Sequence, residues 1–346
     1  MHLRRTAIGV AALTGFAAAL SGGSTALAAG GSGGSGARLG VYAAGLTAPL
    51  GIDTRGKGFV VAENMSGVVA IGKRGGKHFL VPNAAGASGV TSRGRKVYTV
   101  IGGPDESGKP PAGKYAATSV LRTNARTGRT VAIANLEKYE LAHNPDRQKQ
   151  FNAQHQPYDA LSNPFSVTTY PRGLLVADGG ANDVLRVNPR TGKVSTFFVP
   201  PTVKPSEVPA CGGPQAQANP GTVGCDPVPT GVTYARGSVW VLTLGAFAPG
   251  AGRIYKLNPR NGHVQRVIKG LNAPVGLAVN RSSIFFGEPN GPAGDIARIH
   301  NGKVTHASVP SPTGLVIRRG VLFATSGTFG PPRSGKVVRV HTYDFH

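Results

Sequence analysis

Cysteine, acidic residues and catalytic motifs are all scarce in this chain. Its 346 residues include 2 Cys and only 15 Asp or Glu. The single Gly-x-Ser-x-Gly match, at residues 30–34, lies in a Gly- and Ser-rich stretch and not between a predicted strand and a predicted helix, so no nucleophile elbow is indicated. Lys-Ser or Lys-Thr does not follow the glycine-rich stretches, so no phosphate-binding loop is indicated either. The 9 His residues are not accompanied by the closely spaced Cys pair of a zinc site. The sequence therefore identifies no catalytic nucleophile.

Charged residues are also few, at 15% of the chain, whereas glycine and proline are abundant, at 51 and 27 residues. Such a composition provides many turns and leaves little room for helices. A chain of this length can bury a large core by itself. We therefore expect one large all-β domain.

The first 28 residues have the features of a secretory signal peptide. Arg4 and Arg5 precede an apolar run over residues 7–20, and Ala26-Leu27-Ala28 provides a cleavage site. The apolar run is too short to span a bilayer. We therefore expect residues 1–28 to be a signal peptide and the mature protein to be secreted, in the periplasm or outside the cell.

Two export routes are compatible with this segment. The arginine pair is a feature of the twin-arginine route, but Thr6-Ala7-Ile8 matches that motif poorly, and we favour the general secretory route. No Cys follows the signal, so no lipid anchor is implied. Residues 29–37 are rich in Gly and Ser, which predicts a flexible linker. The ordered domain is expected to occupy residues 38–346.

The two cysteines, Cys211 and Cys225, lie in one loop rich in proline and glycine. In an oxidising compartment an even number of cysteines favours a disulfide. Closing a loop of about 15 residues stabilises a protein by about 3 kcal/mol in the chain-entropy model. A metal site is the alternative, but no nearby His completes a zinc ligand set.

A six-fold repeat organises the ordered domain. Each repeat begins with a Gly or Ser anchor and continues with short apolar strands bounded by Gly, Asn and Pro. A repeat of about 40 to 45 residues with four strands, A to D, is typical of a β-propeller blade. The anchors are Gly51, Gly89, Ser166, Gly231, Gly276 and Gly314.

The last repeat lacks a fourth strand, because the chain stops soon after its third. An exposed strand edge must be covered. The segment 38–46 is followed by residues 47–51, which parallel the residues 272–276 that follow the outer strand of blade four. We therefore predict that the N-terminal segment is a D strand that completes blade six and closes the ring. The predicted fold is an all-β, six-bladed β-propeller.

Three segments are longer than the blade repeat requires: 102–118, 136–161 and 200–229. The second begins with a sequence that favours a short helix over residues 136–143, which Asn144-Pro145 would stop. Long loops on a rigid ring either carry binding determinants or are surface padding. The sequence leaves both interpretations open.

Four runs of the sequence resemble the ScyD/ScyE family of secreted bacterial proteins. They are SNPF (162–165), LLVADGGANDVLRVNP (174–189), VPTGV (228–232) and LTLGAFAPGAGRIYKL (242–257), and the similarity covers most of residues 38–340. That family is similar to the wider six-bladed group of NHL-type repeats and gluconolactonase-like calcium enzymes. The resemblance implies a periplasmic or extracellular propeller, with founding members associated with making the sunscreen scytonemin, and no defined activity. The polar residues between Asn144 and Ser162 depart from the family pattern.

The propeller topology predicts where a binding site would lie. Strand A runs from one face and strand B returns to it, so the starts of A strands and the ends of B strands meet at one rim. The B strands end at Glu63, Asp178, Thr243, Glu288 and Ser326. Asn163 at an A-strand entrance and Asn182 in a turn add further oxygens. The predicted ligand-binding residues are Glu63, Asn163, Asp178, Asn182, Thr243 and Glu288.

Four of these residues are candidate metal ligands: Glu63, Asn163, Asp178 and Glu288. Ca²⁺ prefers several carboxylate and carbonyl oxygens, and the gluconolactonase-like enzymes hold their metal with a comparable set. The alternative is that residues 178–183 simply form a B-to-C turn, in which Asx side chains bond their own backbone. Calcium is the only cofactor that the sequence suggests.

The formal charge is +23, and removal of Arg4 and Arg5 with the signal leaves +21. So high a charge attracts polyanions. An anionic cell-wall or extracellular polymer is the favoured partner, since no nucleic-acid motif accompanies the charge. The alternative is that basic residues dispersed over turn tips, such as Arg93 and Arg95, only aid solubility. Net charge does not distinguish these cases.

Two functions follow from these observations. The first is a monomeric, non-catalytic binding or scaffold protein for a protein partner, an anionic polymer or a small ligand. The second is a Ca²⁺-dependent hydrolase or lactonase with its site at the channel mouth. Binding is favoured because a catalytic site needs a base with an orienting partner, and the sequence shows none. Whether the chain is an enzyme stays open.

Overall fold

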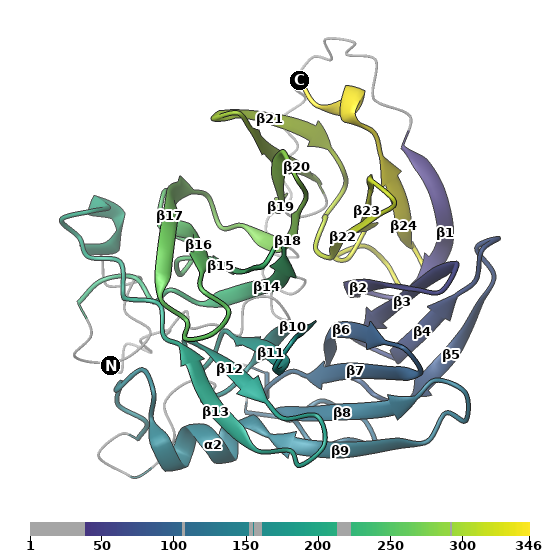
Figure 1. Cartoon of the computed structure of the whole chain (residues 1–346), viewed down its shortest axis with the longest axis horizontal. Helices are drawn as coiled ribbons and strands as arrows, with labels where there is room; N and C mark the ends of the chain where they lie inside the picture. Colours follow the sequence, from purple (N-terminus) through teal and green to yellow (C-terminus); the bar gives the residue numbers. More distant parts are fainter. Residues whose placement is uncertain (1–38, 106–107, 152–154, 156–160, 213–222, 291–292) are drawn as a thin grey trace, which may run out of the picture.

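Six antiparallel sheets of four strands each are arranged in a ring (Figure 1). This computed structural model describes residues 39–105, 108–151, 155, 161–212, 223–290 and 293–346. The predicted signal peptide, 1–28, and linker, 29–37, lie outside the described residues. The all-β, six-bladed propeller predicted from the sequence is confirmed.

The first five blades each use four consecutive strands. Blade one contains β2 (Pro49–Arg55), β3 (Gly58–Glu63), β4 (Gly67–Ile71) and β5 (Lys77–Pro82). Blade two contains β6 (Ala87–Arg93), β7 (Lys96–Ile101), β8 (Ser119–Asn124) and β9 (Thr130–Asn135). Blade three contains β10 (Pro164–Tyr170), β11 (Gly173–Asp178), β12 (Asp183–Val187) and β13 (Val194–Phe198). In each blade these strands are A to D in order.

The remaining blades follow the same plan. Blade four contains β14 (Pro229–Ala235), β15 (Ser238–Thr243), β16 (Gly252–Leu257) and β17 (Val264–Leu271). Blade five contains β18 (Val275–Val279), β19 (Ser283–Asn290), β20 (Ala293–His300) and β21 (Lys303–Ser308). Blade six contains β22 (Leu315–Arg318), β23 (Val321–Ser326), β24 (Gly335–Val340) and, from the N-terminal end, β1 (Gly40–Leu46).

The N-terminal strand closes the ring, as predicted. β1 pairs antiparallel with β24, and Val41 lies opposite Val338; in Figure 1 the purple β1 runs beside the yellow β24. Tyr42 also packs edge-on against Phe59 of blade one and Phe323 of blade six, with ring centroids 4.9 and 5.7 Å apart. The closing strand therefore covers the free edge of blade six and joins the last blade to the first.

The anchor residues are small because neighbouring A strands approach one another closely around the channel. A Cβ atom on Gly314 would lie 2.2 Å from the carbonyl oxygen of Leu50, and one on Gly51 would lie 2.6 Å from that of Ser88. Real Cβ atoms do not come so close to backbone, so only glycine fits these positions. Away from the channel, hydrophobic clusters fill the space between consecutive blades.

Helix α2 (Leu136–His143) follows β9, where the sequence predicted it. The Asn135 side chain caps its first turn by accepting a hydrogen bond from the Lys138 N–H at 2.8 Å, and Asn144 ends it with a left-handed φ of 43°. The predicted helix and its stop are therefore confirmed. No helix in the described part of the chain is long and apolar enough to cross a membrane.

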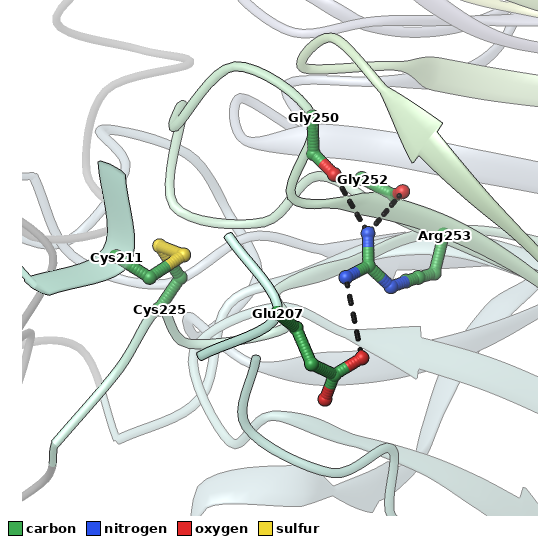
Figure 2. Close-up of a disulfide and its surroundings, with 6 residues drawn as sticks. All are labelled: Glu207, Cys211, Cys225, Gly250, Gly252 and Arg253. Carbon is green, nitrogen blue, oxygen red and sulfur yellow. Dashed lines mark hydrogen bonds and ion pairs between the residues drawn. A yellow bond between two sulfur atoms is a disulfide. The ribbon is translucent and has the colours of Figure 1, made fainter. Parts of the chain in front are cut away.

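The predicted disulfide between Cys211 and Cys225 is present (Figure 2). It ties the short helix η1 (Pro209–Gly212) to the segment just before β14, and both cysteines are fully buried. Beside it, Arg253 donates hydrogen bonds to the carbonyls of Gly250 and Gly252 and lies 3.8 Å from Glu207. A disulfide indicates a protein that folds outside the reducing cytoplasm.

Candidate functional site

The two faces of the ring are chemically different. The register places Pro49 opposite Glu63 and Pro164 opposite Asp178, so A-strand starts and B-strand ends share one rim. This rim, formed by the B-to-C and D-to-A connections, is called the loop rim. Because antiparallel strands alternate in direction, all A-to-B and C-to-D turns lie on the opposite side, called the turn face.

At the loop rim, the predicted site residues of blades one and four are occupied by local contacts. The Glu63 carboxylate is buried and accepts hydrogen bonds from the Thr47 N–H, at 3.1 Å, and from the Ser66 hydroxyl. The Thr243 hydroxyl is buried and donates to the Arg253 carbonyl at 3.4 Å. Glu63 therefore ties the connection between β1 and β2 to blade one, and Thr243 bonds within blade four. A ligand-binding role for either residue stays a prediction.

Blade three brings together the predicted residues Asn163, Asp178 and Asn182. The Asp178 carboxylate accepts hydrogen bonds from the Asn163 N–H and the Ser162 hydroxyl, both at 2.6 Å. The Asn163 side-chain oxygen accepts from the Gly103 N–H at 2.9 Å, and that of Asn182 from the Val228 N–H at 3.2 Å. These residues therefore connect blade three to the segments before β8 and β14.

The predicted metal ligands come from three different blades. Asn163 and Asp178 belong to blade three, whereas Glu63 lies at the end of β3 and Glu288 within β19. Among the residues that the structure describes, no group of three or more His, Cys, Asp or Glu side chains could hold a metal ion. The calcium site of Glu63, Asn163, Asp178 and Glu288 therefore stays a prediction.

Glu288 lines a pocket of about 510 Å³ above blade five. Asp295 lies directly opposite it in the β19–β20 ladder, and Phe247 and Phe329 provide apolar walls from the loops of blades four and six. Burial raises the pKa of Glu288, although His306, with Nδ1 3.5 Å from the carboxylate, opposes this shift. Two carboxylates between aromatic rings suit a small cationic group.

Three residues of this pocket are not among those predicted from the sequence: Asp295, Phe247 and Phe329. Asp295 could have been found, because a residue at the start of strand C lies opposite the end of strand B in every blade. The two phenylalanines could not, since they lie in connections of blades four and six that have no fixed place in the repeat.

The central channel contains a cavity of about 260 Å³ lined by the A strands of all six blades. Asp53 is the only acidic or basic residue among its lining residues. Its carboxylate accepts hydrogen bonds from the Ser92 N–H at 2.7 Å and the Thr91 hydroxyl at 3.0 Å, and burial raises its pKa. Among the described residues that line the channel, no acid is therefore paired with a base for catalysis.

The turn face is basic in every blade. Each A-to-B turn has an exposed Lys or Arg in it or beside it, and none of these turns contains an acidic residue. The exposed residues are Lys57, Arg93, Arg95, Lys96, Arg172, Arg236, Arg281 and Arg319. These turns end the strands that line the channel, so their side chains surround one mouth of it.

The C-to-D turns add a second, outer set of basic residues on the same face. They also contain no acidic residue, and their exposed basic residues are Lys73, Arg74, Arg126, Arg129, Arg190, Lys193, Arg260 and Lys303. We call both sets together the basic turn face. In the described chain the acidic residues other than Asp53 and Asp344 lie in or beside the loop rim. The positive charge is therefore concentrated on one side of the molecule.

Some of these arginines also have structural contacts. Arg172 donates a hydrogen bond to the Arg260 carbonyl at 3.0 Å, and Arg236 donates to the Arg281 carbonyl at 2.7 Å. These contacts join turns of neighbouring blades. A carbonyl is a neutral acceptor, so it does not cancel the guanidinium charge. The ion pairs of Glu207 with Arg253 and Lys269 lie at the loop rim, away from the turn face.

Comparison with known proteins finds similar solved structures but no matching family or curated sequence. No protein-family model matches the chain, and no curated protein matches it. A glucose dehydrogenase structure is similar with a TM-score of 0.51 and 14% identity, over 88% of this chain and 99% of that one. The PQQ-bound aldose sugar dehydrogenase from Streptomyces coelicolor is similar with a TM-score of 0.49 and 11% identity, over 86% and 95%.

At such low identity the likeness concerns the fold alone. None of these matches names the ScyD/ScyE family, so the resemblance drawn from the sequence stays a prediction. The chain is similar to solved propeller structures, and its function must be argued from its own residues.

Proposed function

We propose that this protein is a non-catalytic binding propeller that holds an anionic polymer against its basic turn face. One observation carries the proposal: exposed Lys or Arg residues occur at the A-to-B turn of every blade, and no acidic residue occurs in these turns. Exposed basic residues also occur on the loop-rim side, but most of the acidic residues lie there too, so the net positive charge is concentrated on the turn face. Concentration on one face creates a strong positive potential there.

The geometry suits a repeating polyanion better than a single small anion. The basic groups are spread over the inner and outer turns of the ring, on separate blades, and are not gathered in one pocket. A long chain of sulfate, phosphate or carboxylate groups can contact many of them at once. Each contact is weak and exposed, so affinity arises from their number and from the release of counterions.

The described residues support binding over hydrolysis. In the channel, Asp53 is hydrogen-bonded to its neighbours in β6 and has no partner that would make it a general base. At the loop rim, backbone and hydroxyl donors occupy the carboxylates of Glu63 and Asp178. A base with an orienting partner is the minimum for acid–base catalysis, and Asp53, Glu63 and Asp178 lack one. In blade five, His306 lies 3.5 Å from Glu288, but it belongs to the outer strand β21.

Salt dependence tests the proposal. We expect the purified protein to bind dextran sulfate and not neutral dextran. Its affinity should fall by at least about tenfold when NaCl is raised from about 50 mM to about 500 mM, because salt screens exposed charges and opposes counterion release. Calorimetric or fluorescence titrations, with and without EDTA, measure the affinity at each salt concentration. Failure to bind dextran sulfate, or affinity that ignores salt, would contradict the proposal.

A further inference from the structure

Two fully buried carboxylates lie opposite each other at the loop rim of blade three. Asp178 ends β11 and Asp183 begins β12, and the two residues are direct partners in the antiparallel ladder. Both have no exposed surface. Residues directly opposite in such a ladder point to the same side of the sheet, where two like charges destabilise it. A chain with 38 basic residues has thus placed two of its 15 acidic ones together.

The two carboxylates differ in their hydrogen bonds. Asp178 accepts from Ser162, Asn163 and the Ala181 N–H. Neither oxygen of Asp183 has a hydrogen-bond partner. Burying an unpartnered carboxylate is costly unless an opposite charge accompanies it. No hydrogen bond from the protein therefore offsets the cost of burying the Asp183 carboxylate.

The segment after β9 brings more oxygens to the same place. Glu140 of α2 is buried, with one oxygen accepting from the Gln150 amide and Oε2 without a partner. Asn144, the C-cap of α2, donates its amide to the Gln148 carbonyl and leaves its buried Oδ1 without a partner. Glu140, Asn144 and Asp183 thus offer oxygens that no described hydrogen bond uses.

A hydrogen bond places this segment beside the hairpin that carries Asp183, because the Asn182 amide donates to the Asp146 carboxylate at 3.2 Å. Burial, followed by the charges of Asp178, Glu140 and Asp146, raises the pKa of Asp183 well above its ordinary value. Burial and the neighbouring Asp146 raise the pKa of Glu140 to about 8. No Lys or Arg contributes to either shift. A cation held among these carboxylates would favour their charged forms.

We infer that Glu140, Asn144 and Asp183 bind a calcium ion between α2 and blade three, with Asp146 and Asp178 adding negative charge around it. The ligand set is all oxygen, which suits Ca²⁺ and lacks the His or Cys that zinc prefers. Two carboxylates and one amide leave positions for water and backbone carbonyls, which calcium sites commonly include. This site shares only Asp178 with the one predicted at the channel mouth.

Such an ion would fix the segment after β9 onto the ring. α2 contacts blade three, where the Tyr139 hydroxyl lies 2.9 Å from that of Thr196, and Asp146 contacts the Asn182 amide. The ion would join the C-terminal end of this helix to the hairpin between β11 and β12. It would therefore act as a structural calcium, and its effect should appear in stability.

The experiment uses chelator-treated full-length protein. We expect CaCl₂ at about a hundredfold above its Kd to raise Tm by about 5 °C, with MgCl₂ at the same concentration less effective. Metal analysis after dialysis against CaCl₂ should find about one equivalent of bound calcium. Asp183→Asn should remove the calcium-dependent rise, while the chelated variant keeps a Tm at least equal to that of the chelated parent, because a buried charge is gone.

Asp295→Asn is the matched control, because Asp295 lies opposite Glu288 at the same register in blade five. It should keep the full calcium response. The inference is overturned if calcium does not shift the Tm of the parent protein, or if Asp183→Asn retains the shift. It is also overturned if Asp295→Asn loses the response, which would place the ion in blade five. None of these outcomes depends on polyanion binding.

Discussion

Replacing one basic residue at each A-to-B turn with glutamine is expected to lower the affinity for dextran sulfate by about two orders of magnitude at about 0.15 M salt. The changes, one in each blade, are Lys57→Gln, Arg93→Gln, Arg172→Gln, Arg236→Gln, Arg281→Gln and Arg319→Gln. They remove six of the eight basic residues at these turns, leave Arg95 and Lys96 in blade two, and keep the apolar cores intact. The slope of affinity against salt should also become shallower, because fewer counterions are released.

A control with the same change in net charge separates position from total charge. It carries six glutamines on the loop-rim side, at Lys109, Lys114, Lys138, Lys149, Lys204 and Arg333, all of which are exposed. We expect this variant to keep affinity within about fivefold of the parent, because long-range attraction alone depends weakly on distant charges. Equal losses in the two variants would show that net charge, and not the turn face, governs binding.

Gly314→Ala is expected to destabilise the ring by about 3 kcal/mol. Gly314 immediately precedes β22, and an added Cβ would lie 2.2 Å from the Leu50 carbonyl oxygen in β2. Relief requires blades six and one to move apart, which would also disturb the packing of Tyr42 against Phe59 and Phe323. Urea denaturation, followed by circular dichroism, measures the change in the free energy of unfolding.

Gly76→Ala is the matched substitution for this experiment. Gly76 also has a φ outside the left-handed region, but nothing lies within 4 Å of its added Cβ. The same chemical change should therefore alter stability by less than about 1 kcal/mol, of either sign. If Gly314→Ala were as mild as Gly76→Ala, the close approach of the A strands around the channel would be wrong.

Most of the fold could be predicted from the sequence, because each repeat contains the strands of one blade. The anchors mark places where A strands nearly touch, and a glycine at Gly51 or Gly314 is required by the neighbouring carbonyl. The closing strand was predictable because residues 47–51 resemble a segment that follows another outer strand. Blade six lacked a fourth strand and the N-terminal segment belonged to no other blade, so the two could be matched to each other.

The candidate site was less predictable, because the sequence shows which residues end strands and not what contacts them. The position of Glu63 at the end of a B strand could be predicted, whereas the hydrogen bonds that its carboxylate accepts from Thr47 and Ser66 could not. The sequence places Asp183 in or beside a B-to-C turn. It does not show that the Asp183 carboxylate is buried without a hydrogen-bond partner, or that Glu140 of a distant segment lies near it. No repeat pattern records such contacts between a blade and an inserted loop.

The basic turn face, in contrast, was present in the sequence. Once strands A to D are assigned, their alternating direction places residues such as Arg172, Arg236 and Arg281 on one side. Net charge alone could not show this, and the position of each turn in the blade could.

Lysine footprinting with dextran sulfate tests the central claim most directly. Brief acetylation followed by mass spectrometry reports the reactivity of each lysine with and without the polymer. The account predicts that the polymer protects Lys57, Lys96, Lys193 and Lys303 on the turn face, while Lys109, Lys114, Lys138 and Lys204 on the loop-rim side stay reactive. Equal protection on both sides, or protection of the loop-rim lysines alone, would contradict it.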